Sequence, residues 1–267
     1  KAITLRINPY IESMTPTGIL EQYHWEDYCL QMEANQFPSL LMLLFPYTLL
    51  PPLIARYAWL ASNLILTGLM IILLRSTFLK GLDRRLFMLL MLFMISGTPY
   101  RNQLGVGQHT IFSFCFFLAA VWFSMRDEES RKAGYQVGTV LCLAVSYFKY
   151  TLTVPLALYF VYKRKWKELL LSVSIHVVMT IFAAFWLKES FLNMILQPLL
   201  VSKALAAQGG IDLGALLHGS SIAFIIAGIL MVVLLIMMII MPKGSDALVI
   251  SVLALVSLII TYHRTYD

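Results

Sequence analysis

The stretch that decides the fold is Tyr135–Tyr162, YQVGTVLCLAVSYFKYTLTVPLALYFVY, which is suited to a membrane throughout except for one central lysine, Lys149. It is longer than the roughly 20 residues with which an α-helix crosses a bilayer, yet each side of Lys149 supplies only about half a crossing. The stretch is therefore either one long tilted helix or a helical hairpin with Lys149 at its tip. The choice decides the orientation of the rest of the chain: a segment after Tyr162 that is cytoplasmic under one alternative is on the outer side under the other.

Basic residues around the apolar runs distinguish these alternatives. They form three blocks and one weaker signal: Arg75, Lys80, Arg84 and Arg85; Arg126, Arg131 and Lys132; Lys163, Arg164, Lys165 and Lys167; and Lys243. By the positive-inside rule, all four face the cytoplasm. An even number of crossings must then separate neighbouring blocks, which between the second and third blocks requires the hairpin. We therefore predict a hairpin whose Lys149 tip lies towards the outer face.

The composition sets the class of protein. Of 267 residues, 60% are hydrophobic and only 13% charged, which is typical of a polytopic membrane protein. The net charge of +6 therefore reports topology, and no basic, aromatic-rich soluble module indicates nucleic-acid binding. Cys29, Cys115 and Cys142 lack metal-ligand spacing, so we expect small core residues and no disulfide framework.

The predicted fold is all-α: a polytopic transmembrane helix bundle with about eight crossings, counting the hairpin. The apolar runs are Leu53–Leu74, Leu86–Ile95, Thr110–Met125, Tyr135–Tyr147, Thr151–Tyr162, Leu169–Leu187, Ser221–Met241 and Ala247–Thr261. We expect one membrane domain, with an outer loop (1–38), a re-entrant or interfacial segment (39–52), the bundle (53–262) and an outer tail (263–267). The polar ends suggest an internal piece of a longer chain, truncated at both ends. No soluble domain or internal repeat is evident.

Polar clusters at the predicted outer face are the functional candidates, because ionisable groups near hydrocarbon are costly. Gln108 and His109 follow a glycine turn where an outer loop, Tyr100–Gln108, meets a span; this is either a ligand contact or an ordinary helix start. Lys149 either snorkels outward or neutralises a phosphate at headgroup level.

The other clusters lie nearer the chain ends. His263, Arg264 and Asp267 directly follow a span, and the arginine offers a phosphate fork; the alternative is an interfacial belt. Glu26 and Asp27 lie among aromatic residues, where a carboxylate could be a general base or simply part of a solvated interfacial helix.

Two further polar positions are expected to be structural. Lys188-Glu189 is interpreted as a solvated span end within an outer loop, Lys188–Ser220. His176, inside a span, is interpreted as a polar residue packed in the bundle.

Several short segments, in order along the chain, carry a resemblance to a known family. The early block comprises Pro9-Tyr10, Pro46, Leu50-Pro51-Pro52, Ala55, Trp59 and Asn63. The central block comprises Gly107-Gln108-His109, Lys149 and Lys163–Lys167, and the late one is Tyr262–Asp267. Together they resemble the family-87 glycosyltransferases, polytopic members of the C-type superfamily typified by polyprenyl-phosphate-mannose-dependent mannosyltransferases. Tyr150 departs from the proline that commonly follows the family's lysine.

The resemblance implies a hexosyltransferase in the cell membrane, in a bacterial inner membrane, working at the outer face by inversion. The donor would be a sugar, mannose most commonly, on a polyprenyl phosphate. The acceptor would be a hydroxyl of a glycan or glycolipid, and no metal or other cofactor would be needed. The family's catalytic carboxylate precedes an Asn-Pro-Tyr-like segment, so the base would lie upstream of Lys1 and the fragment could be inactive; Glu26 or Asp27 is the fallback.

The same resemblance assigns roles to the outer clusters. Lys149 and Arg264 would bind the lipid phosphate, Gln108, His109 and His263 would line the sugar or phosphate pocket, and Asp267 would orient Arg264 or His263. The alternative function is a membrane transporter or lipid flippase, which would place polar groups on broken helices near the bilayer midplane. A third possibility is a scaffold without chemistry.

Overall fold

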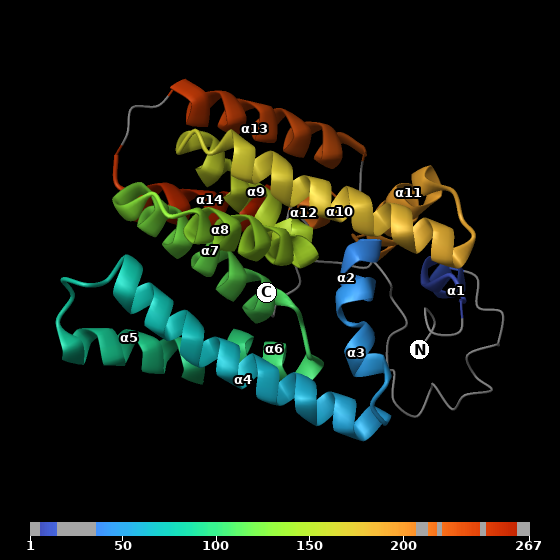
Figure 1. The fold of residues 1–267 in the computed structure, drawn as a ribbon, viewed down its shortest axis with the longest axis horizontal. Helices are drawn as coiled ribbons and strands as arrows, with labels where there is room; N and C mark the ends of the chain where they lie inside the picture. The colour runs from blue at the N-terminus through green and yellow to red at the C-terminus, as the bar shows by residue number, and fades with distance from the viewer. Residues whose placement is uncertain (1–5, 15–35, 207–212, 218–220, 241–243, 261–267) are drawn as a thin grey trace. The chain divides into compact units, whose positions relative to one another are not determined.

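The computed structural model describes residues 6–14, 36–206, 213–217, 221–240 and 244–260, and over these ranges the chain forms helices and no strand (Figure 1). The helices are α1 (Pro9–Met14), α2 (Pro38–Leu43), α3 (Phe45–Thr48), α4 (Pro52–Thr77), α5 (Arg84–Ser96), α6 (Thr98–Val106), α7 (Thr110–Ser130), α8 (Ala133–Ser146), the 3₁₀ helix η2 (Tyr147–Lys149), α9 (Tyr150–Tyr162), α10 (Trp166–Leu187), α11 (Phe191–Ala206), α12 (Leu213–Leu216), α13 (Ser221–Ile240) and α14 (Asp246–Ile260). The all-α prediction is confirmed.

Within the described residues, each of the eight predicted apolar runs forms a helix, namely α4, α5, α7, α8, α9, α10, α13 and α14. Within the described residues, four helical stretches are long and apolar enough to cross a membrane: Pro52–Thr77, Thr110–Ser130, Ala133–Tyr162 and Trp166–Leu187. The third of these is interrupted at η2, so it is not one continuous crossing. Shorter apolar helices accompany them at Phe191–Val201, Ile225–Ile240 and Asp246–Ile259. The chain is therefore an all-α polytopic membrane protein.

Two predicted loops contain helices, and these predictions were wrong. The expected outer turn at Tyr100–Gln108 is mostly α6, which starts with proline in its first turn and ends at Gly107, whose φ of 72° is the left-handed conformation that glycine favours. The expected loop Lys188–Ser220 contains α11, whose apolar pattern Pro198 interrupts. A proline inside a membrane helix is tolerated because neighbouring groups re-satisfy the freed backbone.

Contacts divide the chain into two compact units. Unit 1 comprises residues 1–59 and 174–208, and unit 2 comprises 60–173 and 209–267. In unit 1, α1 packs against α11, and the fully buried Tyr10 donates its hydroxyl to the Gln36 carbonyl at 2.6 Å. The segment 39–52 contains most of α2 and all of α3, and both are too short to cross a membrane. Whether the segment is re-entrant or interfacial stays a prediction. Whether the units form a single membrane domain stays a prediction.

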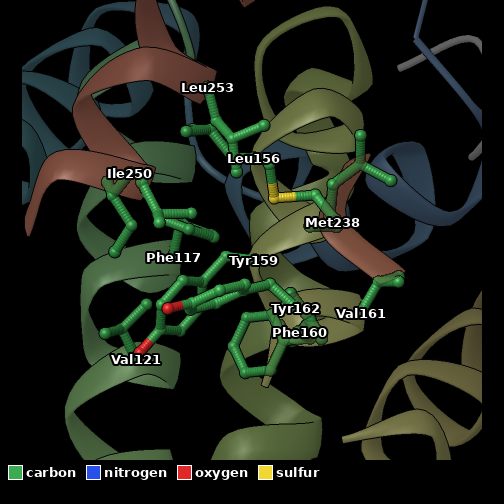
Figure 2. Close-up of a cluster of buried hydrophobic side chains, with 14 of the residues drawn as sticks. Phe117, Val121, Leu156, Tyr159, Phe160, Val161, Tyr162, Met238, Ile250 and Leu253 are labelled. Carbon is green, nitrogen blue, oxygen red and sulfur yellow. The ribbon is translucent and has the colours of Figure 1, made fainter. Parts of the chain in front are cut away.

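Unit 2 is built around α7 and α9. Helix α7 packs along α8, while α9 packs against α13 and α14. Figure 2 shows their shared core, in which Phe117 of α7 meets Tyr159 and Phe160 of α9, with Met238 and Leu253 beyond. The rings of Phe117 and Phe160 are 6.2 Å apart in an edge-to-face arrangement. This aromatic core fixes α9 alongside α7.

The chain reverses direction at η2, so the predicted hairpin is confirmed. Gln136, near the start of α8, donates from Nε2 to Oε1 of Glu168 at 3.1 Å, and Glu168 lies in the first turn of α10, which follows α9. In one straight helix, residues 136 and 162 would lie about 39 Å apart at 1.5 Å per residue. Lys165 Nζ also lies 2.7 Å from Asp127 Oδ2, at the far end of α7. A single rod through Lys149 is excluded.

The reversal gathers charged segments at one end of unit 2. Lys163 Nζ lies 3.2 Å from Glu128 Oε2 and 3.4 Å from Asp246 Oδ2, so the residue that follows α9 contacts the last turn of α7 and the first residue of α14. The second and third basic blocks therefore share a side, as the positive-inside argument required. That this end faces the cytoplasm stays a prediction.

Candidate functional site

Lys149, at the tip of the hairpin, is a buried lysine held against the start of α7. Its side chain is 6% exposed. The ammonium Nζ donates to Thr110 Oγ1 at 2.6 Å, and the backbone N–H donates to Ser113 Oγ at 3.0 Å. Because Thr110 is the first residue of α7 and His109 precedes it, the hairpin tip meets the glutamine–histidine turn. The structure thus brings together two neighbouring clusters that the sequence placed about 40 residues apart.

Three buried hydroxyls explain why the chain can turn here inside a membrane bundle. Lys149 has φ −103° and ψ 73°, which breaks the helix and frees backbone groups that apolar surroundings cannot satisfy. Besides Ser113, Thr153 Oγ1 donates to the carbonyls of Ser146 at 2.8 Å and Lys149 at 3.0 Å. Ser257 of α14 donates to the Leu152 carbonyl at 3.0 Å. All three hydroxyl residues are fully buried.

His109 is a neutral imidazole beside this ammonium. Burial, and next the charge of Lys149, lower the pKa of the half-buried His109 from 6.5 to about 4. A neutral imidazole offers one donor and one acceptor, so it can donate to a phosphate oxygen, or donate to or accept from a sugar hydroxyl. The preceding turn is fixed because the N–H groups of Gly107 and Gln108 both donate to the Gln103 carbonyl, at 2.9 and 3.1 Å.

Two sources of positive potential meet at the tip. The N-terminus of a helix carries a partial positive charge and N–H groups without partners inside the helix. At α7 the N-cap residue, His109, makes no side-chain capping hydrogen bond, and the Lys149 ammonium touches the helix's first residue. Like charges repel, so this arrangement favours an anion. Chemically, it can bind and stabilise a phosphate.

The remaining predicted site residues cannot be placed in this geometry. Glu26, Asp27, His263, Arg264 and Asp267 lie outside the described residues. Their roles stay predictions. Across the described ranges, no three His, Cys, Asp or Glu side chains are grouped as a metal site, and whether the protein needs a metal also stays a prediction.

Sequence reasoning missed the hydroxyl partners of the hairpin. Thr110 and Ser113 lie one helical turn apart, so they share a face of α7. That spacing is the only available signal, and it is weak, because Ser and Thr in apolar helices often bond to their own helix instead. Thr67, for example, donates to the Asn63 carbonyl at 2.8 Å.

The Lys188-Glu189 prediction is confirmed in part: α10 ends at Leu187 and Lys188 is exposed, as expected of a solvated span end. Glu189 differs, because it is half-buried and accepts from Asn8 Nδ2 at 3.0 Å, through Oε1, and from Asn193 Nδ2 at 3.4 Å, through Oε2. Asn8 also caps α1, because its Oδ1 accepts from the Tyr10 N–H at 3.0 Å. Glu189 therefore ties the Asn8–Tyr10 segment to α11.

Two other structural predictions agree with the contacts. His176 Nδ1 lies 2.6 Å from Ser39 Oγ, so it is a polar residue with a partner within unit 1. Cys115 is 1% exposed and packs in an apolar cluster with Met70 and Leu118; Cys142 packs at its edge, and both are free thiols. Cys29 lies outside the described residues.

Comparison of the sequence and structure with known proteins identifies the family of this chain. No curated protein and no solved structure matches the chain. The family model described as glycosyltransferase family 87 matches residues 38–261, which is most of the chain and includes both the His109 turn and the Lys149 hairpin. The apolar helices and this match together make the chain a membrane glycosyltransferase: it belongs to glycosyltransferase family 87.

Proposed function

We propose that this glycosyltransferase transfers a hexose, mannose first among the candidates, from a polyprenyl-phosphate donor to a hydroxyl of a glycan or glycolipid. The reaction takes place at the outer face of the cell membrane, in a bacterial inner membrane. The observation that carries the proposal is the buried Lys149 ammonium at the start of α7. Membership of a glycosyltransferase family favours this function over a transporter or lipid flippase.

The choice of a lipid-linked donor rests on the position of the cation. Lys149 lies at the tip of a hairpin whose other end carries the ion pairs of Lys163 and Lys165. If those basic loops are cytoplasmic, the tip points to the outer side, where nucleotide sugars are not supplied. A polyprenyl phosphate presents its charge at headgroup level with its chain in lipid. A compact ammonium at membrane depth suits such a phosphate.

In the proposed mechanism, a carboxylate base removes the proton of the acceptor hydroxyl, which attacks the anomeric carbon and inverts it. The bond from the sugar to the lipid phosphate breaks, and negative charge grows on the leaving phosphate. Lys149 and the first turn of α7 stabilise that charge in a site that needs no reorganisation. His109, being neutral, donates or accepts one hydrogen bond at the sugar or phosphate. Arg264 and His263 complete the pocket, with Asp267 orienting them.

The test is transfer by membranes that carry the full-length protein in a host lacking the activity. Labelled polyprenyl-phosphate mannose, glucose and arabinose are compared with GDP-mannose added to washed membranes. We expect transfer from a lipid-linked sugar only. Right-side-out and inverted vesicles, given an impermeant acceptor, distinguish the two faces. Transfer from the nucleotide sugar, or only at the cytoplasmic face, would refute the proposed donor or sidedness.

The matched variants are Lys149→Met and Lys132→Met. Methionine keeps the length of the side chain and removes the charge; Lys132 is an exposed lysine at the opposite end of α8. We expect Lys149→Met, like Arg264→Ala, to reduce transfer by at least about 100-fold, as loss of electrostatic stabilisation of an anion does. Lys132→Met should keep wild-type turnover. Normal turnover of well-expressed Lys149→Met would remove this lysine from the site.

A further inference from the structure

The hydroxyl groups around the hairpin tip fall into two kinds. Ser113 accepts a hydrogen bond from the backbone N–H of Lys149, and Thr153 and Ser257 donate to carbonyls of the turn. These three hydroxyls satisfy backbone groups that the reversal opens. Thr110 differs from them, because its Oγ1 accepts a hydrogen bond from the ammonium of Lys149 itself. Folding of the turn therefore does not account for this contact.

The contact between Thr110 and Lys149 is short and buried. Nζ lies 2.6 Å from Oγ1, and the two residues are 6% and 8% exposed, respectively. Hydrogen bonds with one charged partner are among the strong ones. Lysine has a flexible four-carbon stem, whereas threonine is branched at Cβ and stiff. A threonine on the first turn of α7 can therefore fix where the ammonium sits.

We propose that Thr110 is a positioning residue that holds the Lys149 ammonium for the phosphate of the donor. This inference rests on the proposed function, because it assigns the phosphate to Lys149. Thr110 lies on the helix whose N-terminus adds positive potential, so its hydroxyl aligns the ammonium with that potential. Without the hydroxyl, the ammonium would sample other rotamers, and part of the phosphate's binding energy would be spent in ordering it.

The experiment measures phosphate binding by the purified full-length protein. The probes are a short-chain isoprenyl monophosphate and the corresponding isoprenol, and the readout is affinity from ligand-dependent thermal stabilisation. Thr110→Val removes the hydroxyl with little change in shape, Thr110→Ala provides a second hydroxyl-free variant, and Thr110→Ser keeps the hydroxyl. Ser257→Ala is the control, because it loses a turn hydroxyl that donates to the backbone carbonyls of Thr151 and Leu152.

We expect Thr110→Val and Thr110→Ala to weaken binding of the phosphate by about 10- to 100-fold, as loss of a hydrogen bond to a charged group does. Thr110→Ser should stay within a few-fold of wild type, and Ser257→Ala should lower the melting temperature without changing affinity. In the Lys149→Met background, Thr110→Val should have no further effect, because the two residues act through one contact.

Three results would overturn the role of Thr110 while leaving the proposed function intact: wild-type affinity in Thr110→Val, equal loss in Thr110→Ser, or an undiminished effect of Thr110→Val in the Lys149→Met background. A different result marks failure of the proposed function. If wild-type protein binds the isoprenol as tightly as the phosphate, no phosphate site exists and both proposals fall.

Discussion

We predict that Lys163 stabilises the open end of the hairpin, where its ammonium forms two ion pairs that act as a clamp. Its side chain is 11% exposed and lies 3.2 Å from Glu128 and 3.4 Å from Asp246, which are 40% and 21% exposed. Lys163→Met removes the charge, keeps the apolar stem and leaves two carboxylates close together. The stem's packing is largely retained, so the measured loss reports the ion pairs.

The exposures set the magnitude. Breaking a fully buried ion pair costs about 3–5 kcal/mol, whereas an exposed pair is worth about 0–1 kcal/mol. The Glu128 pair belongs near the exposed limit and the Asp246 pair between the two, so we expect a loss of about 2 kcal/mol. For a chain of this size that corresponds to a melting temperature lower by about 4–8 °C.

The assay is thermal unfolding of the purified protein in detergent at one fixed scan rate, since such unfolding is often irreversible. Lys132→Met, an exposed lysine near the same end, is the control. Burial lowers the pKa of Lys163, but the carboxylates of Asp246 and Glu128 outweigh it and raise the pKa above 10.5. Its contribution is complete below the unfolded value, so the difference should be the same at pH 7 and pH 9. Equal melting of Lys163→Met and Lys132→Met would refute the clamp.

Two further predictions concern α8 and the histidine turn. A Cβ on Gly138 would lie 2.9 Å from the Phe123 ring, whereas one on Gly134 meets nothing within 4 Å. Gly134→Ala should therefore stabilise the protein by up to about 1 kcal/mol, and Gly138→Ala should destabilise it by about 1 kcal/mol. The melting temperatures of the two variants test this. The pKa of His109 falls from 6.5 to about 4 on folding, so its share of stability is complete above pH 6.5 and lost towards pH 4. Acidification from pH 7 to pH 5 should cost wild type about 1–2 kcal/mol more than His109→Asn; equal losses would contradict a buried neutral histidine.

Most of the fold was predictable because membrane helices are specified locally. Apolar runs predict where these helices lie, and within the described residues all eight expected runs are helical. The hairpin was also predictable, although its arms are too short to be recognised by length. The charges of Arg126–Lys132 and Lys163–Lys167 had to share a side. The ion pairs Lys163–Glu128 and Lys165–Asp127 show that these segments do so. Helices α6 and α11 were missed because proline and glycine read locally as loop signals.

The candidate site was predictable only in part. Lys149 stood out because a charge in an apolar run is costly, and Gln108-His109 because a polar turn met a span. That His109 and Lys149 are neighbours depends on how α7 and the hairpin pack. The hydroxyls that hold Lys149 gave no usable signal, since serine and threonine are common in such helices and usually bond to their own backbone.

The sequence alone thus determined the eight apolar helices, the reversal at Lys149 and the sharing of one side by the second and third basic blocks. These follow from transfer free energies, which depend on each residue's own chemistry and on its place in the chain. Only the tertiary structure decided that Lys149 lies against Thr110 and Ser113, that Thr153 and Ser257 satisfy the opened turn, and that Lys163 joins Glu128 to Asp246. Except for that of Thr153, those contacts join residues far apart in the chain, so they depend on how the helices pack, as Phe117 of α7 packs against Phe160 of α9.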